Sequence, residues 1–304
     1  MTITVVVPTW NRPAGLRRAL EGLAAQEPPG ADWEVVVVAS AGDTHAGPVV
    51  EALGSRLCVR VVAEPRPGAS RARNAGLAVS RPVVAFLDDD CVPDRRWLAS
   101  IVRPLFDGEA AGAGGRVLPE PSTPVPRWLG DSLLDFLARY DRGPEPFDLG
   151  ADDYLLTANA AFDRDVLLSA GGFDPHLGPN AGRPTVNDDV DVCRKVVRAG
   201  GRIRYVPDAV VVHDLPASRL RPAYLLRRMY AQGVSDWLLD RQVNAALRDR
   251  GVSDAAARLG RELTVILKQG PWHRSVLLHA AGSVARAAGF SRQAALGHPS
   301  QHGE

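Results

Sequence analysis

The sequence predicts an α/β fold, with a mixed and mainly parallel Rossmann-like sheet first and a helical region after it. Over residues 1–215, short runs rich in valine alternate with helical segments, as in sheets whose parallel strands are joined by crossover helices. From residue 216 onward, leucine, alanine and arginine recur at helical spacing, with thirteen basic and six acidic residues. We therefore expect one domain over residues 1–215 and a helical C-terminal region over residues 216–304.

The expected elements of the first domain follow one another in chain order. A helix after the first strand is expected to have Asn11 as its cap and Pro13 in its first turn, and another helix is expected over residues 70–79. Glycine and proline dominate residues 108–149, which predicts a long irregular loop region. Apolar runs too short for helices and rich in β-branched residues predict strands at 3–7, 34–38, 58–62, 83–87 and 203–212.

Composition excludes several classes of protein. The formal net charge of the 304 residues is +1, so the bulk basic excess typical of nucleic-acid binding is missing. Cys58, Cys91 and Cys193 lie too far apart for a zinc pattern, which favours a reducing cytoplasm. The chain opens on a strand-like run rather than a secretion signal, and no apolar run approaches the roughly 20 residues of a membrane-spanning helix. We expect a cytoplasmic protein, peripheral to a membrane at most.

Three consecutive acids, Asp88, Asp89 and Asp90, directly follow the predicted strand 83–87. Adjacent like charges repel one another, and a divalent cation such as Mg²⁺ or Mn²⁺ relieves the repulsion because it prefers carboxylate oxygens. The carboxyl end of a strand is also where open α/β sheets bind ligands. The triplet therefore predicts a metal-dependent ligand site, the alternative being a solvated acidic turn.

A second acidic segment opens a predicted helix over residues 185–201, with Asn187 as its cap. Acids in a first turn are favoured by the helix dipole, so this cluster also has a purely structural explanation. Asp189 shares the buried stripe of Cys193 and is expected to point inward, with the low pKa that a helix N-terminus favours. Asp188 and Asp191 are expected to cap or anchor the turn.

Six motifs occur in a characteristic order: 5–12 (VVVPTWNR), 72–76 (ARNAG), 86–90 (FLDDD), 171–174 (GGFD), 188–191 (DDVD) and 205–213 (YVPDAVVVH). Together they resemble family 2 glycosyltransferases of the inverting, nucleotide-sugar-dependent GT-A type. The resemblance covers most of residues 3–214. It implies a GT-A catalytic domain over residues 1–215, with a nucleotide-binding half at 1–110 and an acceptor and catalytic-base half at 111–215.

The resemblance also implies roles for single residues. Asp189 matches the catalytic base, Asp88, Asp90 and His213 match metal ligands for Mg²⁺ or Mn²⁺, and Trp128 and Asp188 are candidates for the acceptor site. His213 has an equally simple explanation as a hydrogen-bonded histidine at a strand end, and Trp128 as an ordinary packing residue. Contacts to the nucleotide or donor sugar are implied for Pro8, Thr9, Asn11, Arg12, Arg71, Asp88, Asp89 and Asn159.

The chain departs from the family pattern in two places. The acid that many members carry after the second strand is missing, so Ser40 or Asp43 is expected to substitute in the nucleotide site and the base stays open. The QxxRW motif of processive synthases is also missing, which favours transfer of one sugar per encounter to a small-molecule, glycan or lipid-linked acceptor.

Other functions were weighed against this one. A nicotinamide dehydrogenase is disfavoured because the glycines at 112–115 precede a proline-rich stretch rather than a helix. A nucleotidyltransferase acting on a sugar phosphate, or a nucleotide-sugar-binding module without turnover, stays open. The amphipathic stripe in the C-terminal region favours core packing. Cover of the acceptor pocket, a homodimer through these helices and contact with anionic lipid are the alternatives for this region.

Overall fold

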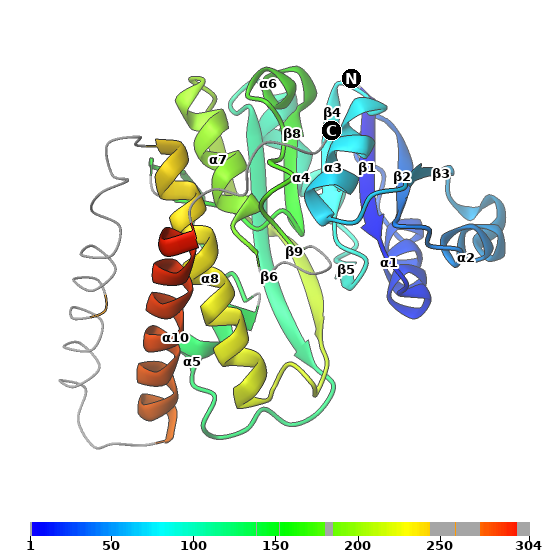
Figure 1. Ribbon diagram of the computed structural model, residues 1–304. Helices are drawn as coiled ribbons and strands as arrows, with labels where there is room; N and C mark the ends of the chain where they lie inside the picture. Colours follow the sequence, from blue (N-terminus) through cyan, green and yellow to red (C-terminus); the bar gives the residue numbers. More distant parts are fainter. Residues whose placement is uncertain are drawn as a thin grey trace. The chain divides into compact units, whose positions relative to one another are not determined.

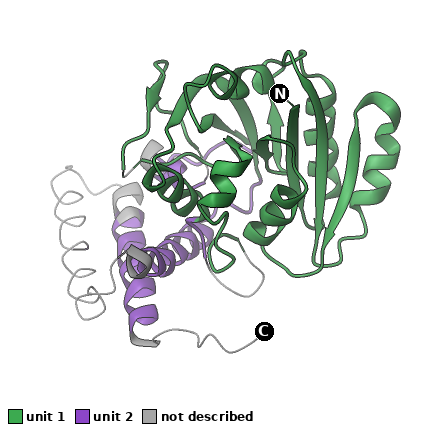
Figure 2. Ribbon diagram, turned by 90° about the horizontal axis from the view of Figure 1, so that it is seen from above, with its two compact units in different colours: residues 1–120, 138–181, 188–215 green, residues 121–137, 182–187, 216–304 purple. Residues whose placement is uncertain are grey.

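The computed structural model describes residues 2–137, 139–151, 153–179, 185–243 and 274–296, together with residue 259 (Figure 1). The chain divides into two compact units, which Figure 2 colours separately. The first unit comprises residues 1–120, 138–181 and 188–215, and the second comprises 121–137, 182–187 and 216–304. Within the described ranges, no helix combines the length and the apolar character needed to cross a bilayer.

Nine strands of the described residues form one sheet in the order β3-β2-β1-β4-β8-β6-β9-β5, with β7 paired to β9. Strands β1 to β4 pair in parallel, whereas β8 runs antiparallel to both β4 and β6, and β5 runs antiparallel to β9. The predicted α/β class with a mixed sheet is confirmed. The strands are β1 Thr2–Thr9, β2 Asp32–Ser40, β3 Val59–Glu64, β4 Val83–Leu87, β5 Cys91–Pro93, β6 Gly112–Pro121, β7 Phe147–Asp148, β8 Asn159–Asp163 and β9 Ile203–Leu215.

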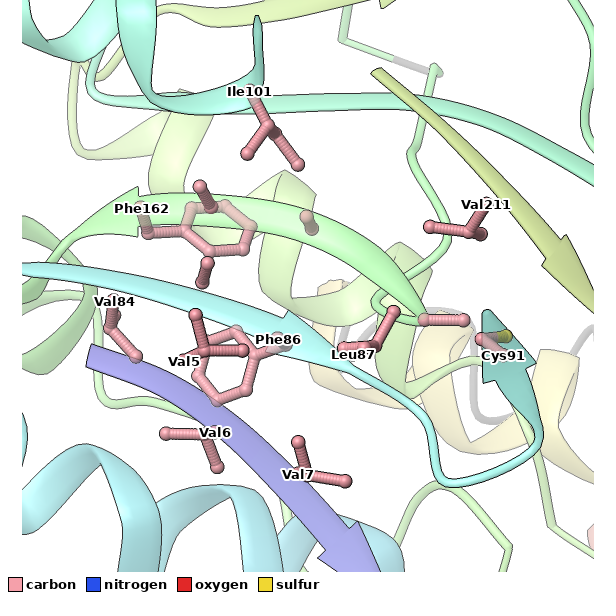
Figure 3. Close-up of a cluster of buried hydrophobic side chains, with 14 of the residues drawn as sticks. Val5, Val6, Val7, Val84, Phe86, Leu87, Cys91, Ile101, Phe162 and Val211 are labelled. Atoms are coloured by element: carbon pink, nitrogen blue, oxygen red, sulfur yellow. The ribbon is translucent and has the colours of Figure 1, made fainter. Parts of the chain in front are cut away.

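The central parallel strands β1, β2 and β4 contain continuous buried apolar runs, as in sheets with both faces covered. Val5, Val6 and Val7 of β1 are all fully buried, and Phe86 of β4 lies beside them in the core (Figure 3). A Cβ atom on Gly76 would lie 2.3 Å from the side chain of Val6, so this glycine lets its helix pack directly on β1. The valine runs that predicted strands are thus the residues that build the core.

Along the chain, the helices of the first unit alternate with these strands. Two long helices of the second unit, α8 and α10, pack along each other (Figure 1). Glycines permit that close approach, since a Cβ on Gly233 would lie 1.7 Å from the carbonyl oxygen of Arg286. The helices are α1 Pro13–Ala24, α2 Ala46–Leu53, α3 Ala69–Ala78, α4 Trp97–Phe106, α5 Asp131–Leu134, α6 Arg164–Ser169, α7 Asp188–Arg198, α8 Pro222–Val243 and α10 Arg274–Leu296, with 3₁₀ turns at Gly54–Arg56 and Asp135–Leu137.

Two local predictions were wrong. The glycine-rich start of residues 108–149 is strand β6, not an irregular loop. The glycines serve close packing there, because a Cβ on Gly115 would lie 1.9 Å from the carbonyl oxygen of Ala209. Asn11 does not cap α1 either, since the N-cap residue is Arg12 and Asn11 adopts a left-handed backbone with φ of 54°.

Candidate active site

The acidic triplet meets the end of β1 because β1 and β4 are parallel neighbours in register. The Thr9 hydroxyl donates to Asp89 Oδ2 over 2.7 Å. Helix α1 approaches the same turn closely, since a Cβ on Gly15 would lie 2.6 Å from the carbonyl oxygen of Asp89. The carboxyl ends of β1 and β4 therefore meet, at the kind of position where open α/β sheets bind ligands.

The side chain of Arg12 lies between two acids of the triplet. Its Nη1 is 3.2 Å from Asp89 Oδ1 and 2.5 Å from Asp90 Oδ2. Burial raises the pKa of Asp89 to about 6, and Asp90 adds to this, while Arg12 and Thr9 act in the opposite direction. The guanidinium supplies here the positive charge that a cluster of carboxylates requires.

His213 reaches the triplet through strand pairing. Cys91 of β5 faces His213 of β9 in the antiparallel register, and the backbone N–H of Asp214 donates to the carbonyl oxygen of Asp90 over 2.8 Å. The His213 Nε2 atom consequently lies 3.5 Å from Asp90 Oδ1, and the imidazole is buried. A carboxylate oxygen and a ring nitrogen therefore lie side by side at this end of the sheet.

Arg73 of α3 is a buried cation that links the two acidic segments. Its Nη2 is 2.7 Å from Asp88 Oδ1 and its Nη1 is 2.5 Å from Asp188 Oδ2. The guanidinium also lies over the ring of Phe173, 5.7 Å from the ring centroid. Burial alone lowers the pKa of Arg73, but Asp88 and Asp188 outweigh it and the net shift is upward. One side chain thus joins residues that are a hundred positions apart.

Asp189 lies beside this link, in the first turn of α7. Its Oδ1 accepts hydrogen bonds from the backbone N–H of Thr157, over 2.8 Å, and from the Thr157 hydroxyl. Burial and the neighbouring Asp188 raise its pKa to about 7, against the lowering effects of Arg73 and Thr157. The low pKa expected from the helix N-terminus was therefore wrong, because desolvation outweighs the dipole.

The structure brings most of the predicted nucleotide-site residues to one edge of the sheet. Pro8 and Thr9 end β1, Ser40 ends β2 and is buried, and Arg71 is half-buried on α3. The exposed Asn11 is tied to this edge, because its backbone N–H donates to Asp43 Oδ2 over 2.6 Å.

Three predicted residues are placed differently from this group. Asn159 is fully buried inside the sheet, where its amide accepts from Trp97 Nε1 and donates to two carbonyl oxygens, so it is committed to the fold. Asp188 is buried against Arg73, as an anchor rather than an exposed acceptor contact. Trp128 is half-buried and belongs to the second unit.

Comparisons with known proteins identify the family of the chain. A family model described as "Glycosyltransferase like family 2" matches residues 2–234. The chain belongs to this family. It is 32% identical over 218 residues to the pre-mycofactocin glycosyltransferase of Mycobacterium tuberculosis, a match that spans 70% of this chain and only 42% of that relative. It is also 27% identical to the glucosyl-dolichyl phosphate glucuronosyltransferase of Haloferax volcanii, over 56% of this chain and 55% of that one.

Solved structures share the fold of this family 2 chain. The mannosyltransferase PcManGT from Pyrobaculum calidifontis, in complex with GDP-Man and Mn²⁺, matches with a TM-score of 0.56 and 21% identity, over 97% of this chain and 76% of that one. TarS of S. aureus, residues 1–349 in complex with UDP-GlcNAc, matches with a TM-score of 0.55 and 15% identity, over 95% and 89%. The predicted GT-A fold is confirmed.

Sequence reasoning missed three contributors to the site of this family 2 chain. Arg73 received no role, although a charged residue among the buried positions of α3 signals a buried ion pair. Thr157 carries no sequence signal, because only the fold brings it to Asp189. Trp10, next to Thr9, is 54% exposed at the end of β1, an unusual position for a large aromatic side chain.

Proposed function

We propose that this chain transfers one sugar from a nucleoside-diphosphate sugar to an acceptor hydroxyl, with inversion at the anomeric carbon. The observation that carries the proposal is the Asp88–Arg73–Asp188 link. It holds the acidic triplet, on the donor side, next to Asp189. A donor site and a proton acceptor within one pocket are what a single displacement requires.

The donor nucleotide is assigned to the edge formed by β1, β2 and α3. Thr9, Asn11 and Ser40 present polar groups there, and Arg12 and Arg71 supply positive charge for a diphosphate. The exposed face of Trp10 at the same edge suits stacking on a base. The structural neighbours with GDP-Man and with UDP-GlcNAc support a nucleotide-sugar donor of either base.

A divalent cation is assigned to Asp90 and His213, with Asp88 at the ribose or metal side. Within the described residues, no group of three or more histidine, cysteine, aspartate and glutamate side chains is arranged to hold a metal alone. Asp90 Oδ1 and His213 Nε2, 3.5 Å apart, fit two positions of one coordination sphere, and a mixed O and N set suits Mn²⁺ better than Mg²⁺. When bound, the cation would neutralise charge on the leaving diphosphate.

Arg12 has a second task in this proposal. Its guanidinium pairs with Asp89 and Asp90, and its side chain is nearly half exposed. If Asp90 were released from this ion pair, the Arg12 guanidinium would be free to bind the donor phosphates.

Asp189 is assigned the role of general base. A carboxylate with a pKa of about 7 exchanges protons near neutral pH, which is the range in which general base catalysis is efficient. The hydrogen bonds from Thr157 hold Oδ1 in place, and Oδ2 is assigned to the acceptor proton.

The test is turnover of a panel of UDP- and GDP-sugars with Mn²⁺, by release of nucleoside diphosphate and NMR of the product anomer. Asp189→Asn should lower kcat by a factor of about 10³ or more, in the range of removing an essential catalytic group. The thermal shift given by the nucleoside diphosphate should persist. Asp191→Asn is the matched control, because Asp191 is another first-turn acid but pairs with Lys195. Loss of nucleotide binding in Asp189→Asn would indicate a structural role instead.

A further inference from the structure

The three residues before α7 form one compact unit with the C-terminal helices. Residues 185–187 are described, and the chain passes from Asn187 directly into Asp188 and Asp189. Thr185 and Asn187 are buried. This short segment therefore leads directly into the first turn of α7, which carries the proposed base.

Asn187 adopts a conformation that needs support. Its φ of 71° lies in the left-handed region, which residues other than glycine seldom adopt and which asparagine tolerates better than most. The sequence suggested Asn187 as the cap of α7, but its amide is used elsewhere. Its Oδ1 accepts from Gln232 Nε2 over 2.5 Å, and its Nδ2 donates to Asp236 Oδ1 over 3.1 Å. Both ends of the amide are thus held by α8.

The groups that hold Asn187 are themselves fixed. Gln232 also donates to Asp236 Oδ1 over 3.1 Å, and Asp236 Oδ2 pairs with Arg286 of α10, whose Nη2 is 2.6 Å away. The preceding residue is held as well, because the Val186 backbone N–H donates to the buried hydroxyl of Ser235 over 2.7 Å. Buried polar networks in which each group is matched specify one geometry.

We propose that the α8–α10 pair is a positioning device for the catalytic base, acting through Gln232, Asp236 and Asn187. This rests on the proposed role of Asp189. The helices hold the left-handed turn at Asn187, and that turn directs α7 so that Asp189 lies against the acceptor. The α8–α10 pair would thus contribute to turnover through the position of Asp189.

The test compares two variants that leave the Asp236–Arg286 ion pair intact. Gln232→Ala removes two hydrogen bonds of the network, and Asn187→Gly removes both amide bonds while glycine still adopts the left-handed backbone. Each should lower kcat about 10-fold or more, since displacement by 1 Å can reduce a rate by about 10²-fold. The donor KM and the nucleotide-induced thermal shift should change less than about twofold by the same argument, because the donor edge is unaltered.

Tyr230→Phe is the matched control. It removes the Tyr230–Arg292 hydrogen bond of the same two helices, away from residues 185–187, and should leave kcat unchanged. If kcat fell as much in Tyr230→Phe as in Gln232→Ala, general destabilisation would replace the positioning role. A loss of nucleotide binding in Gln232→Ala as large as its loss of kcat would lead to the same conclusion.

A double-mutant cycle separates this inference from the proposed function. If α8 acts through Asp189, Gln232→Ala should cause no further loss in the Asp189→Asn background. Full turnover by Asp189→Asn alone would refute the base assignment. Loss of turnover in Asp189→Asn with wild-type kinetics in Gln232→Ala and Asn187→Gly would refute only the positioning role.

Discussion

The two acidic clusters of the first unit contain the same side chain but differ in what faces each carboxylate. After β4, Asp89 and Asp90 contact Arg12, and Asp88 contacts Arg73. In α7, by contrast, Asp189 accepts its hydrogen bonds from the neutral Thr157.

The pKa values follow this difference in neighbours. Asp189 has a pKa of about 7, raised first by burial and then by Asp188, whereas Arg12 limits the rise at Asp89 to about 6. Because these residues are all aspartates, the difference between their pKa values comes from burial and neighbouring charges and not from the residue type.

The largest effect is expected from removing the cation shared by both clusters. Arg73→Met leaves Asp88 and the buried Asp188 without this partner, which should lower the free energy of unfolding by about 3–5 kcal/mol and abolish turnover. Denaturant unfolding measures the first and a sugar-transfer assay the second. Arg18→Met is the control, because its ion pair with Asp214 is largely exposed and should contribute less than about 1 kcal/mol. If Arg73→Met lowered the free energy of unfolding no more than Arg18→Met does, the two clusters would be held independently of Arg73.

The next effect concerns the cluster that is proposed to bind the metal. His213→Gln should weaken the activation by Mn²⁺ by about 10–100-fold, the range found when metal-site partners are lost, and should narrow the preference for Mn²⁺ over Mg²⁺. Titrating Mn²⁺ against the rate measures both. The exposed His176 provides the control variant His176→Gln. Unchanged activation by Mn²⁺ in His213→Gln would leave the imidazole with a packing role at the end of β9.

The sequence predicted the parts of the site that depend on local patterns. Valine runs identified the strands because strands buried on both faces require apolar residues at every position. Three charges directly after a buried strand identified the triplet, and its meeting with Thr9 follows from the parallel register of β1 and β4.

The parts that it did not predict depend on tertiary contacts. Arg73 connects Asp88 with Asp188 only once α3 and α7 are folded together. Gly115 lies in a segment whose composition predicted a loop. The sequence does not reveal that the carbonyl oxygen of Ala209 packs so closely on this residue that an added Cβ would lie 1.9 Å from it. The raised pKa of Asp189 could not be predicted from the sequence. The effect of the helix dipole follows from the residue's place in the first turn, whereas desolvation depends on the surrounding fold.

The third effect is a pH dependence that follows from the pKa of Asp189. The base must be deprotonated, so kcat/KM should rise with pH and be about tenfold lower at pH 6 than on the alkaline plateau, one pKa unit being a factor of ten. The contribution of Asp189 to the free energy of unfolding changes with pH in the opposite direction. The native carboxyl holds its proton more tightly than the unfolded one, so this group stabilises the fold less as pH rises from about 4 to about 7. A rate independent of pH between 5.5 and 8 would assign the proton to another group.

The smallest effect concerns Thr157, the neutral hydrogen-bond donor to Asp189. Thr157→Val keeps the shape and the backbone N–H but removes the hydroxyl that stabilises the charged carboxylate. The acid limb of the pH profile should move to higher pH by about one unit, in line with the loss of one hydrogen bond to a charged group. The plateau kcat should stay within about twofold, since the remaining N–H bond still positions Oδ1. Thr4→Val is the matched control, because its hydroxyl bonds Glu34 away from the site. If the acid limb of the pH profile stays in place while the plateau kcat falls, Thr157 orients Asp189 rather than changing its pKa. Burial and Asp188 would then account for the pKa of Asp189.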